Sequence, residues 1–222
     1  MPVATLVYTR TTGYRHDSIP HAVRALRTFG LAVRHTEDPA VFERALDARP
    51  DAVVLLSTSG DVLTPSGRER LAAYVDGGGG FVGVHAAACT EYGWPYYGNL
   101  LAARFDRHPA YQPGRVRIAD HDHPATQHLP PYWEFTDEWY DFRSDPRDDP
   151  TVRVLAYADE SSYEGATMGG DHPLVWCRDP ERPGPGPGRM FYTSLGHAAE
   201  AYADPAFRSH LAGAIHWTAR HS

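Results

Sequence analysis

The segment GGGGFVGVHAAA, residues 77–88, decides how the chain folds. Its glycines lead into residues 81–84, a short apolar run typical of a central strand covered on both faces. The run stops at His85, and three alanines follow, the residue that most favours a helix. We therefore expect a sharp strand-to-helix corner with His85 at its tip, where open α/β folds place their chemistry. Gly83 would relieve crowding of the backbone at that corner.

The rest of the first half alternates apolar strands with helices. Strands are predicted over residues 4–9, 31–35 and 51–57, and helices after Ser18, over residues 39–48 and after Thr64. Capping residues and early prolines mark where these helices begin. This alternation predicts a parallel sheet with right-handed crossovers, and hence an α/β fold.

The second half is less regular. Strands are predicted over residues 114–119, 151–158, 173–177 and 189–194, and helices from about residue 97 and over residues 205–219. The run PGPGPG, residues 183–188, cannot form a regular element and is predicted to be a flexible hairpin loop. Because the sequence has no internal repeat and no clear boundary, residues 1–222 are predicted to form a single domain.

Composition limits the class of protein. Of the 222 residues 42% are hydrophobic, and the formal net charge is −7. That charge argues against a nucleic-acid-binding protein, which needs a basic face. The sequence has neither an apolar run of the roughly 20 residues that span a bilayer nor a signal-peptide pattern, so no membrane contact is expected. The two cysteines, Cys89 and Cys177, form no C-x-x-C motif, and we expect a reducing cytoplasm.

Three histidines, His16, His85 and His197, lie where predicted strands end. Each alone could be a packed or capping ring. Because the carboxyl ends of parallel strands meet at one edge of a sheet, we expect all three to face one pocket. Imidazoles exchange protons near neutral pH and bind metals, so these histidines are candidate catalytic groups. His85 and His197 are the candidate ligands of a divalent metal such as zinc.

Glu138 is the fourth candidate catalytic residue. A carboxylate among aromatic side chains can have a raised pKa and act as a general acid or base, although a surface carboxylate beside core aromatics would give the same pattern. The aromatic faces nearby could support a sugar ring. The predicted substrate-binding residues are Tyr14, Arg15, Ser59, Asp137, Trp139, Tyr140 and Glu200.

Two further features are weaker candidates. The pair His121-x-His123 could bind a metal, but a polar turn before Pro124 explains it better. Cys89 lies beyond the corner at His85, so we do not expect it to be a nucleophile.

Five motifs together resemble the ThuA-like family, which is named for trehalose utilisation. The motifs are TGYRHxSI at residues 12–19, GGGFVGVH at 78–85, DHPxT at 122–126, DEWY at 137–140 and FYTSLGHxxE at 191–200. The resemblance covers nearly the whole chain. It implies a class I glutamine amidotransferase-like fold, which is a flavodoxin-like three-layer sandwich around a mostly parallel sheet.

The resemblance also has a consequence for the chemistry. In that larger group the strand-to-helix corner carries a nucleophilic cysteine, and a later His-x-Glu supplies the base. Here the corner holds His85, and the later pair is His197 with Glu200 at a longer spacing. Since a histidine cannot form the thioester intermediate, the sequence argues against amidotransferase activity.

Family members are associated with carbohydrate utilisation, often beside oxidoreductases that make 3-keto sugars. The leading hypothesis is therefore an isomerase- or hydrolase-like enzyme whose small-molecule substrate is a sugar, a 3-keto-sugar or a glycoside. Its histidines and Glu138 would provide acid–base chemistry, with or without a metal. The alternative is a non-catalytic sugar-binding or regulatory module. Under either hypothesis the protein could form a homo-oligomer.

Overall fold

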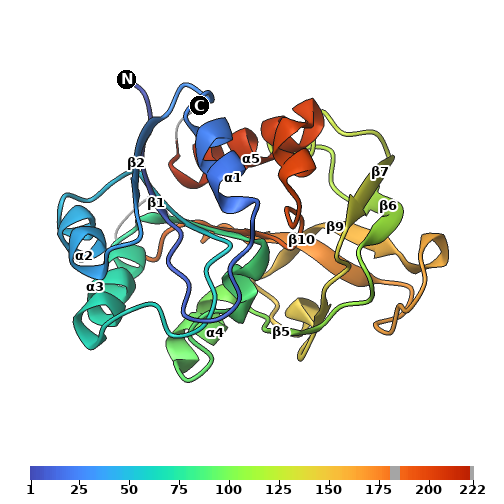
Figure 1. The fold of residues 1–222 in the computed structure, drawn as a ribbon, viewed down its shortest axis with the longest axis horizontal. Coiled ribbons are helices and arrows are strands. Elements are labelled where there is room, and N and C mark those ends of the chain that lie inside the picture. Colours follow the sequence, from blue (N-terminus) through green and yellow to red (C-terminus); the bar gives the residue numbers. More distant parts are fainter. Residues whose placement is uncertain (181–185, 221–222) are drawn as a thin grey trace.

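The computed structural model describes residues 1–180 and 186–220. Within this range nine strands form one sheet in the order β2-β1-β3-β4-β11-β10-β9-β6-β7, and two more form a small second sheet (Figure 1). The strands are β1 Ala4–Tyr8, β2 Ala32–Thr36, β3 Ala52–Leu56, β4 Gly80–Val84, β5 Phe105–Arg107, β6 Gln112–Ile118, β7 Tyr132–Asp137, β8 Asp141–Phe142, β9 Arg153–Asp159, β10 His172–Arg178 and β11 Met190–Thr193. The α-helices are α1 Ile19–Leu26, α2 Pro39–Asp47, α3 Pro65–Asp76, α4 Pro95–Leu101 and α5 Pro205–Thr218.

Helices cover both faces of the sheet. One buried cluster joins α1 and α5 to the first face, and a second joins α2, α3 and α4 to the other. In Figure 1 α1 and α5 accordingly lie above the central strands, and α3 and α4 lie below them. The three-layer α/β sandwich predicted from the sequence is confirmed.

Local sequence explains where the helices begin. Asp38, Thr64 and Asp204 each accept a hydrogen bond from a backbone N–H in the first turn of α2, α3 and α5. Each of these helices also has a proline at its start, where the missing N–H costs nothing. The predicted helix near residue 97 begins slightly earlier, at Pro95, for the same reason.

The sheet has a parallel half and an antiparallel half. Strands β2, β1, β3, β4 and β11 pair in parallel. Every step from β11 through β10, β9 and β6 to β7 is antiparallel. Four reversals restore the original direction, so β7 runs the same way as β11. Its carboxyl end therefore lies at the same edge of the sheet as the ends of the parallel strands.

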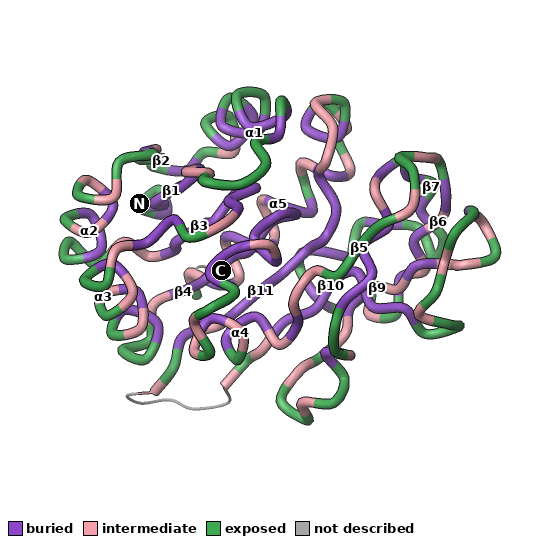
Figure 2. Tube along the Cα trace, turned by 60° about the horizontal axis from the view of Figure 1, so that its bottom comes forward, coloured by how far each residue is buried: buried purple, intermediate pink, exposed green. Residues whose placement is uncertain are grey.

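The central strands of the parallel half of the sheet lie in the core of the protein. Strands β3 and β4 are buried along their whole length, as their sequences AVVLL and GFVGV predicted, and Figure 2 shows them as continuous buried segments. A Cβ on Gly83 would lie 3.1 Å from the Tyr192 ring and 3.2 Å from Leu101. Glycine is needed there because β11 and α4 both approach β4 closely.

The segment after β4 differs from the sequence-based expectation. The corner after β4 is followed by a turn of 3-10 helix, His85–Cys89, rather than by the expected α-helix. Ala86, Ala87 and Ala88 are buried, so packing around these small residues overrides their helix propensity. The first half of the predicted PGPGPG loop, residues 183–185, lies outside the described residues. No described helix combines the length and apolar character that crossing a bilayer requires.

Candidate functional site

Loops from four strands meet at the carboxyl edge of the sheet. His16 follows β1, His85 directly follows β4, and His197 follows β11. The ring centroid of His16 lies 4.6 Å from that of His85 and 5.1 Å from that of His197. Glu138 directly follows β7 and joins them because β7 ends at the same edge. The structure thus brings together all four residues predicted to be catalytic.

His85 is held rigidly at the tip of the corner. Its side chain is fully buried, and Nδ1 donates a hydrogen bond to the Ser194 carbonyl at 2.6 Å. The Tyr192 hydroxyl donates to the His85 carbonyl at 2.9 Å. The backbone φ of His85 is +52°, a left-handed conformation that costs a non-glycine residue on the order of 1–2 kcal/mol. Strain of this kind persists only where the surroundings fix the residue, and it is common at functional sites.

The second imidazole nitrogen of His85 is the centre of the cluster. Its Nε2 lies 3.0 Å from Nε2 of His16, 2.8 Å from the Tyr140 hydroxyl and 3.6 Å from Oε2 of Glu138. Because Nδ1 carries the proton given to Ser194, Nε2 of a neutral ring can accept from the Tyr140 hydroxyl and from Nε2–H of His16.

Glu138 connects the cluster to two more imidazoles. Its Oε2 lies 3.1 Å from Nδ1 of His197, and its Oε1 lies 3.4 Å from Nε2 of His108. Although His197 Nδ1 is close to the carboxylate, it is buried without a hydrogen bond of good geometry among the described residues.

Burial and charge set the protonation states. Burial, followed by the nearby His197, lowers the pKa of His16 from 6.5 to about 4. Complete burial, followed by His16, holds the pKa of His85 well below its ordinary value. The adjacent Glu138 carboxylate raises the pKa of His197. The two buried imidazoles are therefore neutral at pH 7, and protons bind first at His197.

Asp137 ties the loops together instead of facing the pocket. Its carboxylate is fully buried and accepts backbone hydrogen bonds from Gly196 at 2.7 Å, Glu138 at 2.8 Å and His197 at 3.2 Å. Burial raises its pKa to about 7 against the lowering effect of these donors. Asp137 thus fixes the main chain of two cluster residues at once.

A pocket of about 490 Å³ opens in front of the cluster. His16, Glu138 and Tyr140 reach its wall, whereas the buried His85 and the partly exposed His197 do not line it. Tyr14 and Ser59, predicted to bind substrate, also line it, and the Ser59 hydroxyl donates to the Tyr14 carbonyl at 2.5 Å. The remaining lining residues are Gly13, Gly60, Ala86, Cys89, Tyr92, Phe105 and His108.

Sequence reasoning missed His108, Tyr92 and Phe105. Phe105 lies on β5, a three-residue strand without a periodic pattern, and His108 lies in the loop after it. Phe105 and His108 carry no local signal, because the pairing of β5 with β8 brings them beside Tyr140. The Tyr92 hydroxyl donates to the Phe105 carbonyl at 2.7 Å.

Besides Asp137, three predicted substrate-binding residues lie away from the pocket. Arg15 pairs with Glu37 at 2.7 Å, on the far side of its loop. Trp139 is fully buried and stacks on Tyr163 at 4.8 Å between ring centroids. Glu200 is exposed and lines a separate hollow of about 280 Å³.

The motif containing His121 and His123 forms a turn, not a metal site. His121 is exposed, whereas His123 is buried with its ring 4.6 Å from that of Trp217. His123 Nδ1 accepts a hydrogen bond from the Ala125 amide at 3.1 Å. The interpretation of this motif as a turn is consistent with these contacts.

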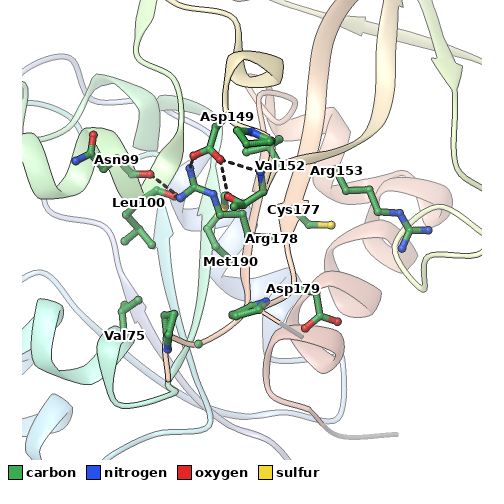
Figure 3. A pocket seen from close by; sticks show the side chains of 15 residues that line it. Val75, Asn99, Leu100, Asp149, Val152, Arg153, Cys177, Arg178, Asp179 and Met190 are labelled. Atoms are coloured by element: carbon green, nitrogen blue, oxygen red, sulfur yellow. Dashed lines mark hydrogen bonds and ion pairs between the residues drawn. The ribbon is translucent and has the colours of Figure 1, made fainter. Parts of the chain in front are cut away.

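A larger cavity of about 780 Å³ lies away from the cluster, between α4, β10 and the start of β11 (Figure 3). Arg178 crosses it and donates to the carbonyls of Asn99 and Leu100. The cavity also borders the segment that the structure leaves undescribed, so we assign it no function. Its charged side chains are in ion pairs, Arg178 with Asp149, Arg153 with Asp120 and Asp179 with Arg189.

Comparison with known proteins identifies the family of this chain. The model of the ThuA family, described by trehalose utilisation, matches residues 4–218. The chain belongs to the ThuA family. Membership places it among proteins of carbohydrate metabolism related to trehalose utilisation. No curated protein sequence matches it.

Solved structures agree with this assignment. A ThuA-like protein of Bacteroides uniformis is 25% identical, with a TM-score of 0.78 over 98% of this chain and 91% of that one. A ThuA-like protein of Parabacteroides merdae is 23% identical, with a TM-score of 0.79 over 99% and 90%. A GMP synthase component of Thermoplasma acidophilum is 13% identical, with a TM-score of 0.58 over 98% and 95%. The last likeness concerns the fold alone, and it agrees with the predicted amidotransferase-like architecture.

Proposed function

We propose that this ThuA-family protein is an enzyme that acts on a sugar or a 3-keto-sugar by proton transfer next to a carbonyl group. The observation that supports this most is the position of Glu138. Its carboxylate reaches the pocket wall and lies within 3.6 Å of nitrogens of three imidazoles, those of His85, His108 and His197. A carboxylate in such a setting is a general base that can also return its proton.

The chemistry follows from a keto-sugar in this pocket. Glu138 takes a proton from the hydroxyl-bearing carbon beside the carbonyl, the C–H electrons form a C=C bond, and the carbonyl oxygen takes up a proton to give an enediol. Loss of the proton from the neighbouring hydroxyl, with return of a proton to the former carbonyl carbon, completes an isomerisation. If the deprotonated carbon is instead bonded to a carbon that carries a leaving group, the enolate can expel that group, and later addition of water to the new C=C bond completes a hydrolase-like reaction. Tyr140 and His108 line the pocket and could donate the protons to the carbonyl oxygen and the leaving group.

The pocket suits a sugar in size and lining. Its volume of about 490 Å³ is within the range of roughly 300–1,000 Å³ for small-molecule sites. Tyr14, Tyr92 and Phe105 offer aromatic faces on which the apolar face of a sugar ring can stack.

A glutamine amidotransferase reaction has less support. Cys89, which lines the pocket, has its pKa raised to about 12 by burial and by the Glu138 charge, so little of it is thiolate at pH 7. The nucleophile position of that fold holds His85. Both cysteines are free, which agrees with the proposed location in a reducing cytoplasm.

The test is solvent deuterium exchange. We expect the protein in D₂O to incorporate deuterium beside the carbonyl of a 3-keto-disaccharide, and not into the parent disaccharide. Glu138→Gln should slow exchange by about 100-fold or more, because it removes the base and keeps the shape. Glu134→Gln, an exposed change on β7, is the matched control.

Two outcomes would count against an enzyme. Exchange at the wild-type rate in Glu138→Gln would show that Glu138 is not the base. Binding of the keto-sugar without exchange or turnover would favour the alternative, a sugar-binding or regulatory module.

A further inference from the structure

The cluster behind the pocket also has the composition of a metal site. Its members are His16, His85, His197 and Glu138, and one candidate ligand atom from each lies within 4.8 Å of the other three. Hydrogen bonding alone leaves part of this arrangement unsatisfied. Nδ1 of His85 carries the proton given to Ser194, so Nε2 has only a lone pair, and this lone pair lies 3.6 Å from a Glu138 carboxylate oxygen, which cannot donate to it. His16 Nδ1 is buried without a hydrogen-bond partner among the described residues, and His197 Nδ1 lies 3.1 Å from the same carboxylate.

Several separations between the ligand atoms are close to those around a tetrahedral ion. Four atoms at 2.0–2.1 Å from a tetrahedral zinc ion lie about 3.3 Å from one another. Three separations are near this value: 3.0 Å between His85 Nε2 and His16 Nε2, 3.1 Å between His197 Nδ1 and Glu138 Oε2, and 3.6 Å between His85 Nε2 and Glu138 Oε2. One ligand atom from each of the four residues lies within 4.8 Å of the other three.

The groups around the cluster are those that support metal ligands. A metal-binding histidine usually donates its other nitrogen to a carbonyl or carboxylate, as His85 does to Ser194. The second carboxylate oxygen of Glu138 faces His108 at 3.4 Å. Asp137 holds the backbone N–H groups of Glu138 and His197, and so fixes two ligands relative to each other.

We propose that His16, His85, His197 and Glu138 bind one divalent transition-metal ion, with zinc the best fit. Three imidazoles and one carboxylate suit zinc or iron(II), whereas magnesium and calcium prefer oxygen ligands alone. Since His16 and Glu138 reach the pocket wall, the ion faces the pocket. The Tyr140 hydroxyl, 2.8 Å from His85 Nε2, lies beside it. Bound there, a metal would polarise a sugar carbonyl or hydroxyl oxygen.

Only this catalytic role rests on the function proposed above, because metal binding can be measured without any substrate. The purified full chain, stripped with dipicolinate and reloaded with zinc, should hold about one ion by elemental analysis, as a single site of four ligands requires. Reloading with cobalt(II) should give the visible absorption bands of a low-symmetry site. His85→Ala and Glu138→Gln should each weaken zinc binding by at least about 10-fold, since changes to outer-shell partners alone cost that much.

His210→Gln is the matched control, because it replaces a buried histidine outside the cluster and should leave binding unchanged. Far-ultraviolet circular dichroism checks that each variant folds. Substoichiometric zinc after reloading, with no cobalt bands, would overturn the metal site. Keto-sugar turnover that survives complete metal removal would also overturn the catalytic role of the ion and leave the enzyme proposal intact. One tightly bound ion without turnover on any keto-sugar would support the metal site and count against the enzyme proposal.

Discussion

At the scale of single residues, His85 explains how the site can exist. A β-strand normally alternates its side chains between two faces, and a side chain just past its end can point along the strand only if the backbone turns abruptly. The left-handed φ of +52° provides that turn, and contacts from Ser194 and Tyr192 keep it in place. The resemblance to class I glutamine amidotransferases implies a nucleophilic cysteine at this corner, whereas this chain has His85 there.

Tyr140 gives a prediction at this scale. Its hydroxyl lies 2.8 Å from His85 Nε2, while its ring packs on Phe105 at 4.4 Å between centroids. Tyr140→Phe should keep the packing and cost about 1 kcal/mol of stability, the typical value of one hydrogen bond. It should slow deuterium exchange into the keto-sugar by about 10–100-fold if the hydroxyl donates a proton. Tyr14→Phe, at an exposed ring on the pocket rim, is the control, and equal rates in both variants would exclude that role.

At the scale of secondary-structure elements, the site depends on how strands far apart in the chain end together. The corner at His85 could be predicted because its signals are local: a glycine turn, four apolar residues and an abrupt stop. Convergence of His16, His85 and His197 followed from parallel strands. The position of Glu138 could not be derived this way, since it depends on four antiparallel steps that carry no individual signature. Glu138 was a candidate only because it is a carboxylate among aromatic residues, a pattern that does not place it beside the histidines.

The same limit explains the misplaced residues. Arg15 and Trp139 stand in motifs beside true pocket residues, but neighbours on an extended segment point in opposite directions. Trp139 therefore enters the core while Glu138 and Tyr140 face the pocket. Glu200 lies three residues after His197, a spacing that would let both share a face of one helix, but the helix there is a 3-10 turn that begins at Ala199, after the histidine.

Asp137 gives a prediction about the joint between elements. Its buried carboxylate is the acceptor for three backbone N–H groups, two of them in the loop after β11. Asp137→Ala leaves these donors without their acceptor, so we expect the free energy of unfolding to fall on the order of 3 kcal/mol or more. Chemical denaturation measures it, and Glu134→Ala on the exposed face of β7 should change stability by less than about 0.5 kcal/mol. If the free energy of unfolding fell as little in Asp137→Ala as in Glu134→Ala, the Asp137 carboxylate would not join the two loops.

At the scale of the whole molecule, the core contains titratable groups outside the site. His210 on α5 is fully buried, and its Nδ1 donates to the Ala125 carbonyl at 2.8 Å. Burial lowers the pKa of His210 from 6.5 to about 4, and burial likewise lowers the pKa of His123 to about 3. Both rings pack against Phe191 of β11, at 5.4 Å and 5.9 Å between centroids, so each is part of the layer that joins α5 to the sheet.

These depressed pKa values make stability depend on pH in a defined direction. Between pH 6.5 and about 4 the unfolded chain binds a proton at residue 210 and the folded chain does not, so the free energy of unfolding falls as pH falls through that window. A shift of that size corresponds to roughly 3 kcal/mol for a fully buried group. His210→Gln removes the titration while leaving a donor for Ala125, and should therefore flatten the dependence of stability on pH in this range. Denaturant unfolding at several pH values measures the slope, with the exposed His21→Gln as the control. If the free energy of unfolding changes with pH equally in His210→Gln and in the wild type, the acid sensitivity arises elsewhere in the fold.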